Sequence, residues 1–316
     1  MSASTKGALL SLLAFAIFAG HDALIKVLGG GYSAFQIIFF SVLFAFPLTT
    51  LMLVQDTTSG TLIPKRPVWT GVRTGAVVIS TICAFYAFSV LPLAQVYAIL
   101  FSTPLLITAL SVPLLGEVVR LRRWVAVAVG LGGVIVVLQP AQIELEWGHG
   151  AALLGAAMGA LSSTIVRKIG REERPVVLLI YPMLAQFGLM CAALPFVFVP
   201  MQGGALALIA CLAILGHIAM RLMIKAYSVA EASTVAPMQF SQILWASLFG
   251  ILFFEEMPSL TTAIGAGIVI ASGLYILLRE RSGASANSPV TATRSRVVAG
   301  VHPRIGPQVD AAKDDT

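Results

Sequence analysis

Long apolar runs separated by short polar joints cover most of the chain. A transmembrane helix needs roughly 20 consecutive, mainly apolar residues, and ten runs reach or approach that length. Glycine and proline mark the joints, as at Pro200 and Pro258. The pattern predicts an all-α integral membrane protein with spans at Gly7–Leu28, Ser33–Val54, Val68–Val90, Leu93–Leu115, Trp124–Leu138, Gly148–Val166, Pro175–Val199, Ala205–Ala226, Ala230–Phe254 and Ser259–Leu278.

The composition supports this interpretation. Of the 316 residues, 58% are hydrophobic and 11% are charged, and the mean hydropathy is +0.93. A soluble domain carries about 25% charged residues, so this chain could not cover a water-facing surface. Cys83, Cys191 and Cys211 lie in three different apolar runs without C-x-x-C spacing. We therefore expect them to be packing residues, and we expect no metal site and no other cofactor.

Basic residues are sorted along the predicted spans. The formal charge is +6, which in a soluble protein could indicate nucleic-acid binding. If the N-terminus lies in the cytoplasm, every Lys and Arg except Lys26 falls on the cytoplasmic side, as the positive-inside rule requires. This sorting predicts a multi-pass protein of a bacterial-type inner (plasma) membrane with both termini in the cytoplasm. The expected partners are a small-molecule substrate and membrane lipid, with no nucleic acid.

The two ends of the chain differ in composition. The first apolar run is too long for the core of a cleavable signal peptide and has no A-x-A exit, so it is expected to remain as the first helix. Residues 280–316 are rich in Ser, Ala, Thr, Pro and Val with scattered charge. Such a segment cannot bury a core, and it is predicted to be a disordered cytoplasmic tail.

An internal repeat divides the spans. An offset of 139 residues relates Ser89–Glu117 to Ser228–Glu256. A second pair of similar segments is Ala23–Gly29 and Thr164–Gly170. Residues 1–139 and 140–279 would then hold five spans each. Because five is odd, the second half would enter the membrane upside down. Inverted repeats place a substrate site near the midplane between the halves, although the repeat could also be structural ancestry in a protein that does not transport. The identical pairs are Ser89/Ser228, Val90/Val229, Val96/Val235, Phe101/Phe240, Ser102/Ser241, Leu105/Leu244 and Glu117/Glu256.

Three segments carry a resemblance to a known family. They read HDALIKVL at His21–Leu28, FSTPLLITALSVPLLGE at Phe101–Glu117 and FSQILWASLFGILFFEE at Phe240–Glu256. In these segments the chain resembles the drug/metabolite transporter superfamily, specifically its EamA-type ten-helix permeases. The resemblance implies solute transport without ATP. Many relatives carry an Arg early in the second helix, where this chain has Ser41.

Ionisable residues inside spans are costly and so each needs a partner or a function. Asp22 and Lys26 are spaced i,i+4 on the first span and could form a structural ion pair near the outer surface. Alternatively, Asp22 binds substrate or a proton in a central cavity, and His21 joins it in a proton relay.

The eighth span carries His217, Arg221 and Lys225 in one stripe. We expect Lys225 to extend to the cytoplasmic interface. Arg221 could bind an anionic group of a substrate or pair with Glu231 or backbone carbonyls. His217 could line the cavity or make a packing hydrogen bond.

The fourth and ninth spans, related by the repeat, are expected to face each other. Amide and aromatic side chains on them could form a cavity for a flat or amphipathic solute or act as polar contacts between helices. Tyr86 and Arg73 on the third span are weaker candidates, and Pro104 and Pro237 could kink their helices and serve gating. The candidate binding residues on the two spans are Tyr97, Phe101, Gln239, Gln242 and Trp245.

Small residues recur on other spans. Gly155 and Gly159 form a G-x-x-x-G motif, and several glycines also reduce the side-chain bulk of the fifth and tenth spans. Close packing within one chain is the expected use, with homodimer formation as the alternative. The protein is thus expected to be a monomer or a homodimer.

Together these patterns predict a secondary transporter, for export or uptake, of a small polar metabolite such as an amino acid, a nucleotide-like or another organic solute. It would work by alternating access, with proton coupling as an option. No G-x-x-x-x-G-K-[ST] loop is present, so ATP hydrolysis by this chain is not expected. The alternatives are a membrane-embedded enzyme, which would need a cluster such as H-E-x-x-H, and a channel or non-transporting sensor, for which a filter-like run would be needed. The chain is not expected to be an enzyme.

Overall fold

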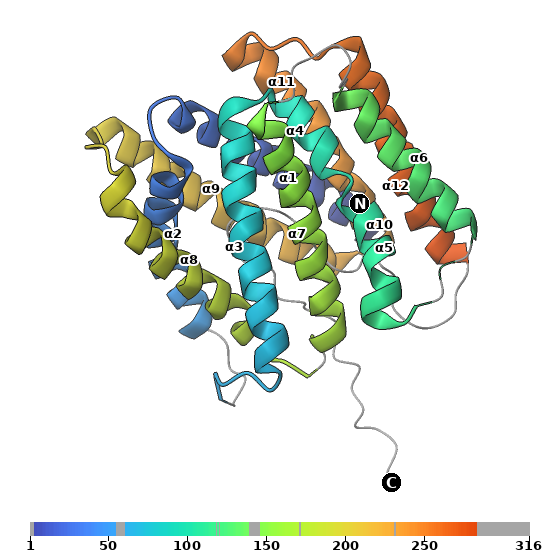
Figure 1. Ribbon diagram of the computed structural model, residues 1–316, viewed down its shortest axis with the longest axis horizontal. Helices are drawn as coiled ribbons and strands as arrows, with labels where there is room; N and C mark the ends of the chain where they lie inside the picture. Colours follow the sequence, from blue (N-terminus) through green and yellow to red (C-terminus); the bar gives the residue numbers. More distant parts are fainter. Residues whose placement is uncertain are drawn as a thin grey trace.

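The computed structural model describes residues 3–54, 61–117, 119, 121–138, 146–170, 172–230 and 232–282. Within those ranges the regular elements are helices, arranged as a bundle (Figure 1). They are α1 (Ala3–Gly29), α2 (Ala34–Val54), α3 (Pro67–Val90), α4 (Leu93–Leu100), α5 (Thr103–Leu115), α6 (Leu121–Leu138), α7 (Trp147–Ile169), α8 (Pro175–Val197), α9 (Gly203–Val229), α10 (Ala232–Val235), the 3-10 helix η1 (Ala236–Ser241), α11 (Gln242–Phe254) and α12 (Leu260–Ser282).

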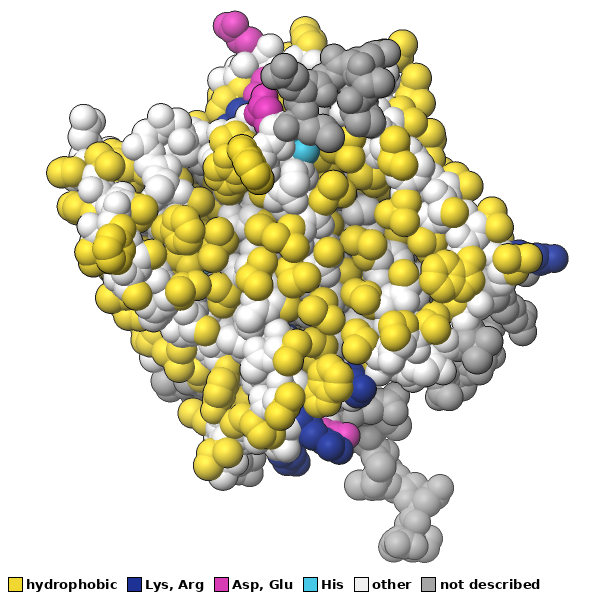
Figure 2. Space-filling model, viewed as in Figure 1, with side chains coloured by type: hydrophobic (Ala, Val, Ile, Leu, Met, Phe, Trp, Pro, Cys, Tyr) yellow, Lys and Arg dark blue, Asp and Glu magenta, His cyan; other side chains and the backbone are white. Residues whose placement is uncertain are grey.

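Each of the ten predicted spans is helical in the described residues. Eight helical segments are long and apolar enough to cross a membrane, and Ala34–Thr50 and Leu260–Ile276 are shorter apolar helices. Large hydrophobic side chains such as Phe196, Phe253 and Leu260 are exposed on the outside, where lipid but not water would accommodate them. Figure 2 shows apolar side chains over the middle of the visible face and the visible charged ones at its margins. The chain is a multi-pass membrane protein.

The fourth and ninth predicted spans are interrupted rather than continuous. Phe101 and Ser102 separate α4 from α5, and the 3-10 helix η1 precedes α11. Pro104 lies in the first turn of α5, after one interruption, and Pro237 lies in the first turn of η1, which is itself the other interruption. In both places the missing proline N–H costs no helical hydrogen bond. The two prolines therefore lie at breaks in their helices, and their role in gating stays a prediction.

Most boundaries differ from the prediction by a few residues, and two of the differences have a clear reason or consequence. α6 begins at Leu121, three residues before the predicted start at Trp124, because a basic stretch continues the helix beyond the apolar run. α12 continues to Ser282, so residues 280–282 are helical and not part of a disordered tail. The predicted outer loop over residues 139–148 lies mostly, and the rest of the predicted tail wholly, outside the described residues.

Glycine permits close helix packing at two interfaces. A Cβ added at Gly265 of α12 would lie 2.6 Å from the Gly133 carbonyl oxygen of α6, and one at Gly155 of α7 would contact Cys83 of α3 at 3.4 Å. Gly155 of the G-x-x-x-G motif, Gly133 of α6 and Gly265 of α12 thus pack against neighbouring helices of the same chain. Gly132 and Gly267 face open space.

Helices from the two ends of the chain interleave. α1 packs along α9, α3 along α7, α2 along α8, and α6 along α12. The α6–α12 pair lies at the right of Figure 1, and α2 and α8 lie at the left. Between them, α1, α4 and α11 bring together the polar residues described next.

Candidate functional site

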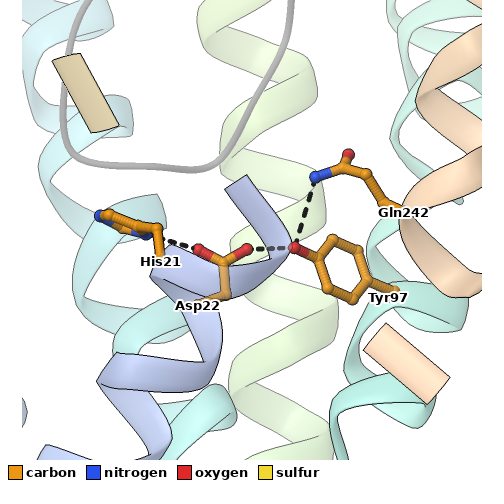
Figure 3. Close-up of polar contacts among 4 residues, drawn as sticks. All are labelled: His21, Asp22, Tyr97 and Gln242. Atoms are coloured by element: carbon orange, nitrogen blue, oxygen red, sulfur yellow. Dashed lines mark hydrogen bonds and ion pairs between the residues drawn. The ribbon is translucent and has the colours of Figure 1, made fainter. Parts of the chain in front are cut away.

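Four polar side chains from three helices meet in the interior of the bundle (Figure 3). Nδ1 of His21 donates to Oδ1 of Asp22 at 2.7 Å, and the Tyr97 hydroxyl donates to Oδ2 of the same carboxylate. Nε2 of Gln242 donates to the Tyr97 oxygen at 3.3 Å. All four side chains are buried. This central cluster (His21, Asp22, Tyr97 and Gln242) joins α1, α4 and α11.

Tyr97 and Gln242 of the central cluster lie beside the two helix interruptions. Tyr97 lies one turn before the break at Phe101, and Gln242 is the first residue of α11 after η1. Interrupted helices in membrane transporters commonly border substrate sites, because irregular backbone is tolerated where it lines a cavity. The sequence placed these residues on facing helices, and the structure joins Tyr97 to Gln242 by a direct hydrogen bond.

Aromatic rings surround the central cluster. The Phe85 ring meets His21 edge-on at 6.4 Å between centroids, and Phe88 and Phe101 lie 5.3 and 5.9 Å from the Tyr97 ring. Phe101 in turn contacts Phe240 at 5.3 Å. On the side of α9, Gly216 faces the imidazole, and a Cβ added there would make an ordinary van der Waals contact with the ring at 3.5 Å. The polar groups are thus held in an apolar, partly aromatic environment.

This arrangement combines groups that accept, donate and exchange protons. A carboxylate accepts hydrogen bonds, imidazole and phenol can do both, and the amide offers one donor group and one acceptor. Linked in a chain, they can pass a proton or exchange partners with a solute. Within the described segments, no group of three His, Cys, Asp or Glu side chains lies close enough to hold a metal ion.

Two other predicted binding residues lie on the same part of the chain. Trp245 follows Gln242 by one helical turn, and its buried indole N–H has no hydrogen-bond partner in the described part of the molecule. Gln239 is half-buried in η1. Both residues are therefore within three positions of Gln242, a member of the central cluster, in the sequence.

The remaining predicted candidates have exposed or half-buried side chains. Arg221 is exposed on α9, and its Nε donates to Nε2 of the half-buried His217 at 2.9 Å. Tyr86 is exposed on α3. Glu231, the suggested partner of Arg221, lies outside the described residues. The structure gives Arg221 a partner on its own helix, so His217 and Arg221 form a pair, while Lys225, the third residue of the stripe, is exposed.

Lys26 does not have the partner suggested by its spacing. Its Nζ forms an ion pair with Oε1 of Glu256 at 2.5 Å and donates to the Leu91 carbonyl oxygen at 2.6 Å. The interpretation as an ion pair with Asp22 is therefore wrong. Asp22 and Lys26 lie on one helix, but their hydrogen-bonded partners come from different elements.

Arg73 is a buried cation that the sequence marked only weakly. Its Nη1 donates to the Leu178 carbonyl oxygen of α8 at 2.5 Å, and its Nε has no partner among the described residues. Pro182 lies four residues after Leu178 and has no N–H to offer that carbonyl. Arg73 thus supplies the donor that the proline removes, which gives it a structural role between α3 and α8.

Comparison with known families identifies the class of protein. The profile of the EamA-like transporter family matches residues 5–139 and again residues 146–278. The chain therefore belongs to the EamA-like transporter family. The first matched range contributes His21, Asp22 and Tyr97 to the central cluster, and the second contributes Gln242.

Curated relatives are named as transporters of different solutes. The chain is 26% identical over 275 residues to an S-adenosylmethionine uptake transporter of Rickettsia bellii, covering 87% of this chain and 94% of that protein. It is 25% identical over 283 residues to the pseudopaline exporter CntI of Pseudomonas aeruginosa, covering 88% and 97%. It is 28% identical over 193 residues to a riboflavin transporter of Rhizobium johnstonii, covering 60% and 63%. Their family and names support a small-metabolite transporter.

A solved crystal structure shares the fold. It aligns with 90% of this chain and 99% of its own length, with a TM-score of 0.58 and 19% sequence identity.

Proposed function

We propose that the protein is a secondary transporter of a small polar organic solute and that the central cluster is its binding site. The observation that carries the proposal is the chain of hydrogen bonds from His21 through Asp22 and Tyr97 to Gln242. Buried ionisable residues in membrane helices are expensive and commonly mark substrate or ion pathways. This one joins both ranges that match the transporter family.

Helix packing supports two inverted repeats, residues 1–139 and 140–279. If α7 corresponds to α1, α8 to α2, α9 to α3 and α11 to the α4–α5 span, the packing of α1 on α9 corresponds to that of α7 on α3. The packing of α2 on α9 corresponds to that of α8 on α3 in the same way. The pairs α2–α8 and α6–α12 correspond to themselves. Such a pseudo-twofold arrangement favours alternating access around a central site.

The orientation follows from charge. Since the positive-inside rule assigns every basic residue except Lys26 to one side, both termini are proposed to face the cytoplasm, and the membrane is the bacterial inner membrane. With five spans in each repeat, the second repeat has the opposite orientation to the first.

The chemistry of the site suggests the kind of solute. Carboxylate, phenol and amide oxygens suit a solute with N–H or O–H donors, and the rings of Phe101 and Phe240 offer apolar faces for a flat group. The relatives are named as transporters of S-adenosylmethionine, riboflavin and pseudopaline. We take S-adenosylmethionine and riboflavin as the first candidate solutes for this protein. We propose a polar metabolite that combines a flat ring or apolar part with hydrogen-bond donors.

Proton coupling is proposed as the driving force. His21 and Asp22 form a site that can take up a proton, and moving one charge across 100 mV supplies about 2.3 kcal/mol. Transport driven in this way does not require ATP hydrolysis.

A binding screen tests the proposal. The purified protein is heated with S-adenosylmethionine, riboflavin, amino acids and nucleotides, and the shift in melting temperature is measured. A solute that binds the native state raises the melting temperature, and the Asp22→Asn variant should lose that rise. Gln186→Leu is the matched control, because Gln186 is also buried and donates to a hydroxyl, that of Thr81, at 2.8 Å. A ligand that stabilises wild type and Asp22→Asn equally would remove the central cluster from the site.

A further inference from the structure

Two partly buried ion pairs lie at opposite ends of the bundle. Lys26, near the end of α1, pairs with Glu256 after α11, and Arg167, near the end of α7, pairs with Glu117 after α5. In Figure 1 α11 ends at the top, whereas α5 and α7 end towards the bottom. The central cluster comes from helices that run between these ends.

The two pairs correspond to each other in the internal repeat. Lys26 and Arg167 occupy the same position in the related segments Ala23–Gly29 and Thr164–Gly170, and Glu117 corresponds to Glu256 at the offset of 139. Each pair also joins one half of the chain to the other. The first basic residue comes from residues 1–139 and its acid from 140–279, and for Arg167 and Glu117 the halves are exchanged.

The backbone before each glutamate is also the same. Gly116 and Glu255 adopt left-handed conformations with φ values of 69° and 56°, and these positions are again 139 residues apart. The following N–H groups of Glu117 and Glu256 donate to the carbonyl oxygens of Ser111 and Gly250 at 3.3 and 3.0 Å. A left-handed residue is unfavourable for a side chain such as that of Glu255, so this helix end is held against a conformational cost. The turn fixes where each glutamate leaves its helix.

The pairs differ from an ordinary surface ion pair. The Lys26 and Glu256 side chains are 12% and 23% exposed, and those of Arg167 and Glu117 are 9% and 32% exposed. Arg66 and Glu172, by contrast, are 57% and 49% exposed. Because partial burial reduces screening by water and salt, the first two pairs are expected to couple their helices more strongly.

The Lys26–Glu256 pair ties a third element to the same point. Lys26 also donates to the Leu91 carbonyl oxygen, and Oε2 of Glu256 accepts from the Leu93 N–H at 3.3 Å. Leu91 and Leu93 flank the turn between α3 and α4. Separation of α11 from α1 would therefore break the ion pair and at least one of the two hydrogen bonds to this turn.

From these observations we propose that Lys26–Glu256 and Arg167–Glu117 are paired latches, each closing one end of the path to the central cluster. The idea rests on the transport function proposed above. Both pairs are formed here and the central cluster is buried, so the structure corresponds to a state closed at both ends. Opening one end requires one latch to break while the other stays formed.

Accessibility of a reporter cysteine tests the latches without a substrate. In a variant lacking Cys83, Cys191 and Cys211, Gln242→Cys places a thiol in the buried centre. A membrane-impermeant thiol reagent is applied either to right-side-out or to inverted membrane vesicles. Lys26→Met should raise the labelling rate from one side, and Arg167→Met should raise it from the other, each about fivefold or more. Arg66→Gln is the control and should leave both rates unchanged.

A charge exchange separates a latch from a simple loss of folding. Arg167→Glu combined with Glu117→Arg restores opposite charges at the same place and should return the labelling rate towards that of the parent. The amount of monodisperse protein in detergent is measured for every variant. The proposal is overturned if both methionine variants label from the same side, if neither changes labelling, or if the exchanged pair labels as fast as Arg167→Met.

The labelling experiment does not require a known substrate, so its result can be separated from that of the transport experiment. If the labelling pattern is as expected but no solute binds or moves, the latches stand and the proposed transport function fails. If solute moves through the Asp22 site but labelling is unchanged by the latch variants, the function stands and the latches fail.

Discussion

Asp22 is the residue on which the proposed site depends. Its two carboxylate oxygens are engaged by His21 and Tyr97, in surroundings formed by buried aromatic rings. A charged acceptor there strengthens each hydrogen bond it receives. The same carboxylate can bind a donor group of a solute or a proton.

Asp22→Asn should therefore slow transport more than it lowers stability. The amide keeps the size of the side chain but removes its charge, and charge-assisted hydrogen bonds are worth about 1.5–3 kcal/mol, which corresponds to roughly ten- to a hundredfold. Solute flux into proteoliposomes is the measurement. Flux within a factor of two of wild type would show that the carboxylate does not serve transport.

Tyr97→Phe isolates the hydroxyl that bridges Asp22 and Gln242. It keeps the ring contacts to Phe88 and Phe101 and removes only the oxygen. We expect affinity for the solute to fall about ten- to a hundredfold, because a hydrogen bond to a charged acceptor is worth about 1.5–3 kcal/mol. A variant that melts earlier but binds normally would assign the hydroxyl to folding.

The exposed pair of Arg66 and Glu172 provides a pH prediction outside the spans. The hydrogen bond and charge of Glu172 raise the pKa of Arg66, and Arg66 lowers the pKa of Glu172 from its usual value of 4.5. The stabilisation by Glu172 is therefore complete above its usual pKa and is lost as the pH falls through the lowered pKa. Glu172→Gln should remove this small acid-side loss, seen in melting curves in detergent at low salt. A larger acid-side loss in the variant would contradict the assignment.

At the level of elements, helix α12 depends on close contact with α6. Gly265→Val should destabilise the protein by about 1–3 kcal/mol, as overpacking does, since a Cβ at Gly265 would lie 2.6 Å from the Gly133 oxygen. Gly267→Val is the matched control, because Gly267 lies on the same helix and faces open space. Equal melting temperatures for the two variants would show that α6 and α12 do not pack so closely.

Apolar periodicity predicted the helices well but not their breaks. Run length fixed the spans within a few residues, because lipid requires a continuous stretch of apolar side chains whatever their identity. The interruptions at Phe101–Ser102 and η1 depend on local backbone geometry. Pro104 and Pro237 lie at these interruptions, but a proline in the sequence is also compatible with a helix that bends without breaking.

Partners across helices were harder to predict than the residues themselves. The sequence selected His21, Asp22, Tyr97 and Gln242 because polar groups stand out in apolar runs. It assigned Lys26 to Asp22 because i,i+4 neighbours are the only contacts that spacing can show. The true partner, Glu256, lies 230 positions away, although the correspondence of Glu117 with Glu256 was a signal that could have found it.

The whole molecule brings together two ranges that match one family. They interleave so that the central cluster needs both, with α1 and α4 from the first and α11 from the second. A site made by two halves can be exposed to either side when one half moves against the other. This arrangement connects the internal repeat in the sequence to transport.

Solute counterflow tests the central claim most directly. Proteoliposomes loaded with a solute identified in the binding screen are diluted into a trace of the same solute in labelled form, and accumulation of the label is followed with no gradient other than that of the solute. Wild type should accumulate label above the level of empty vesicles, and Asp22→Asn should not, while Gln186→Leu behaves as wild type. Label that never exceeds the level in empty vesicles, or that accumulates equally with Asp22→Asn, would contradict transport through the central cluster.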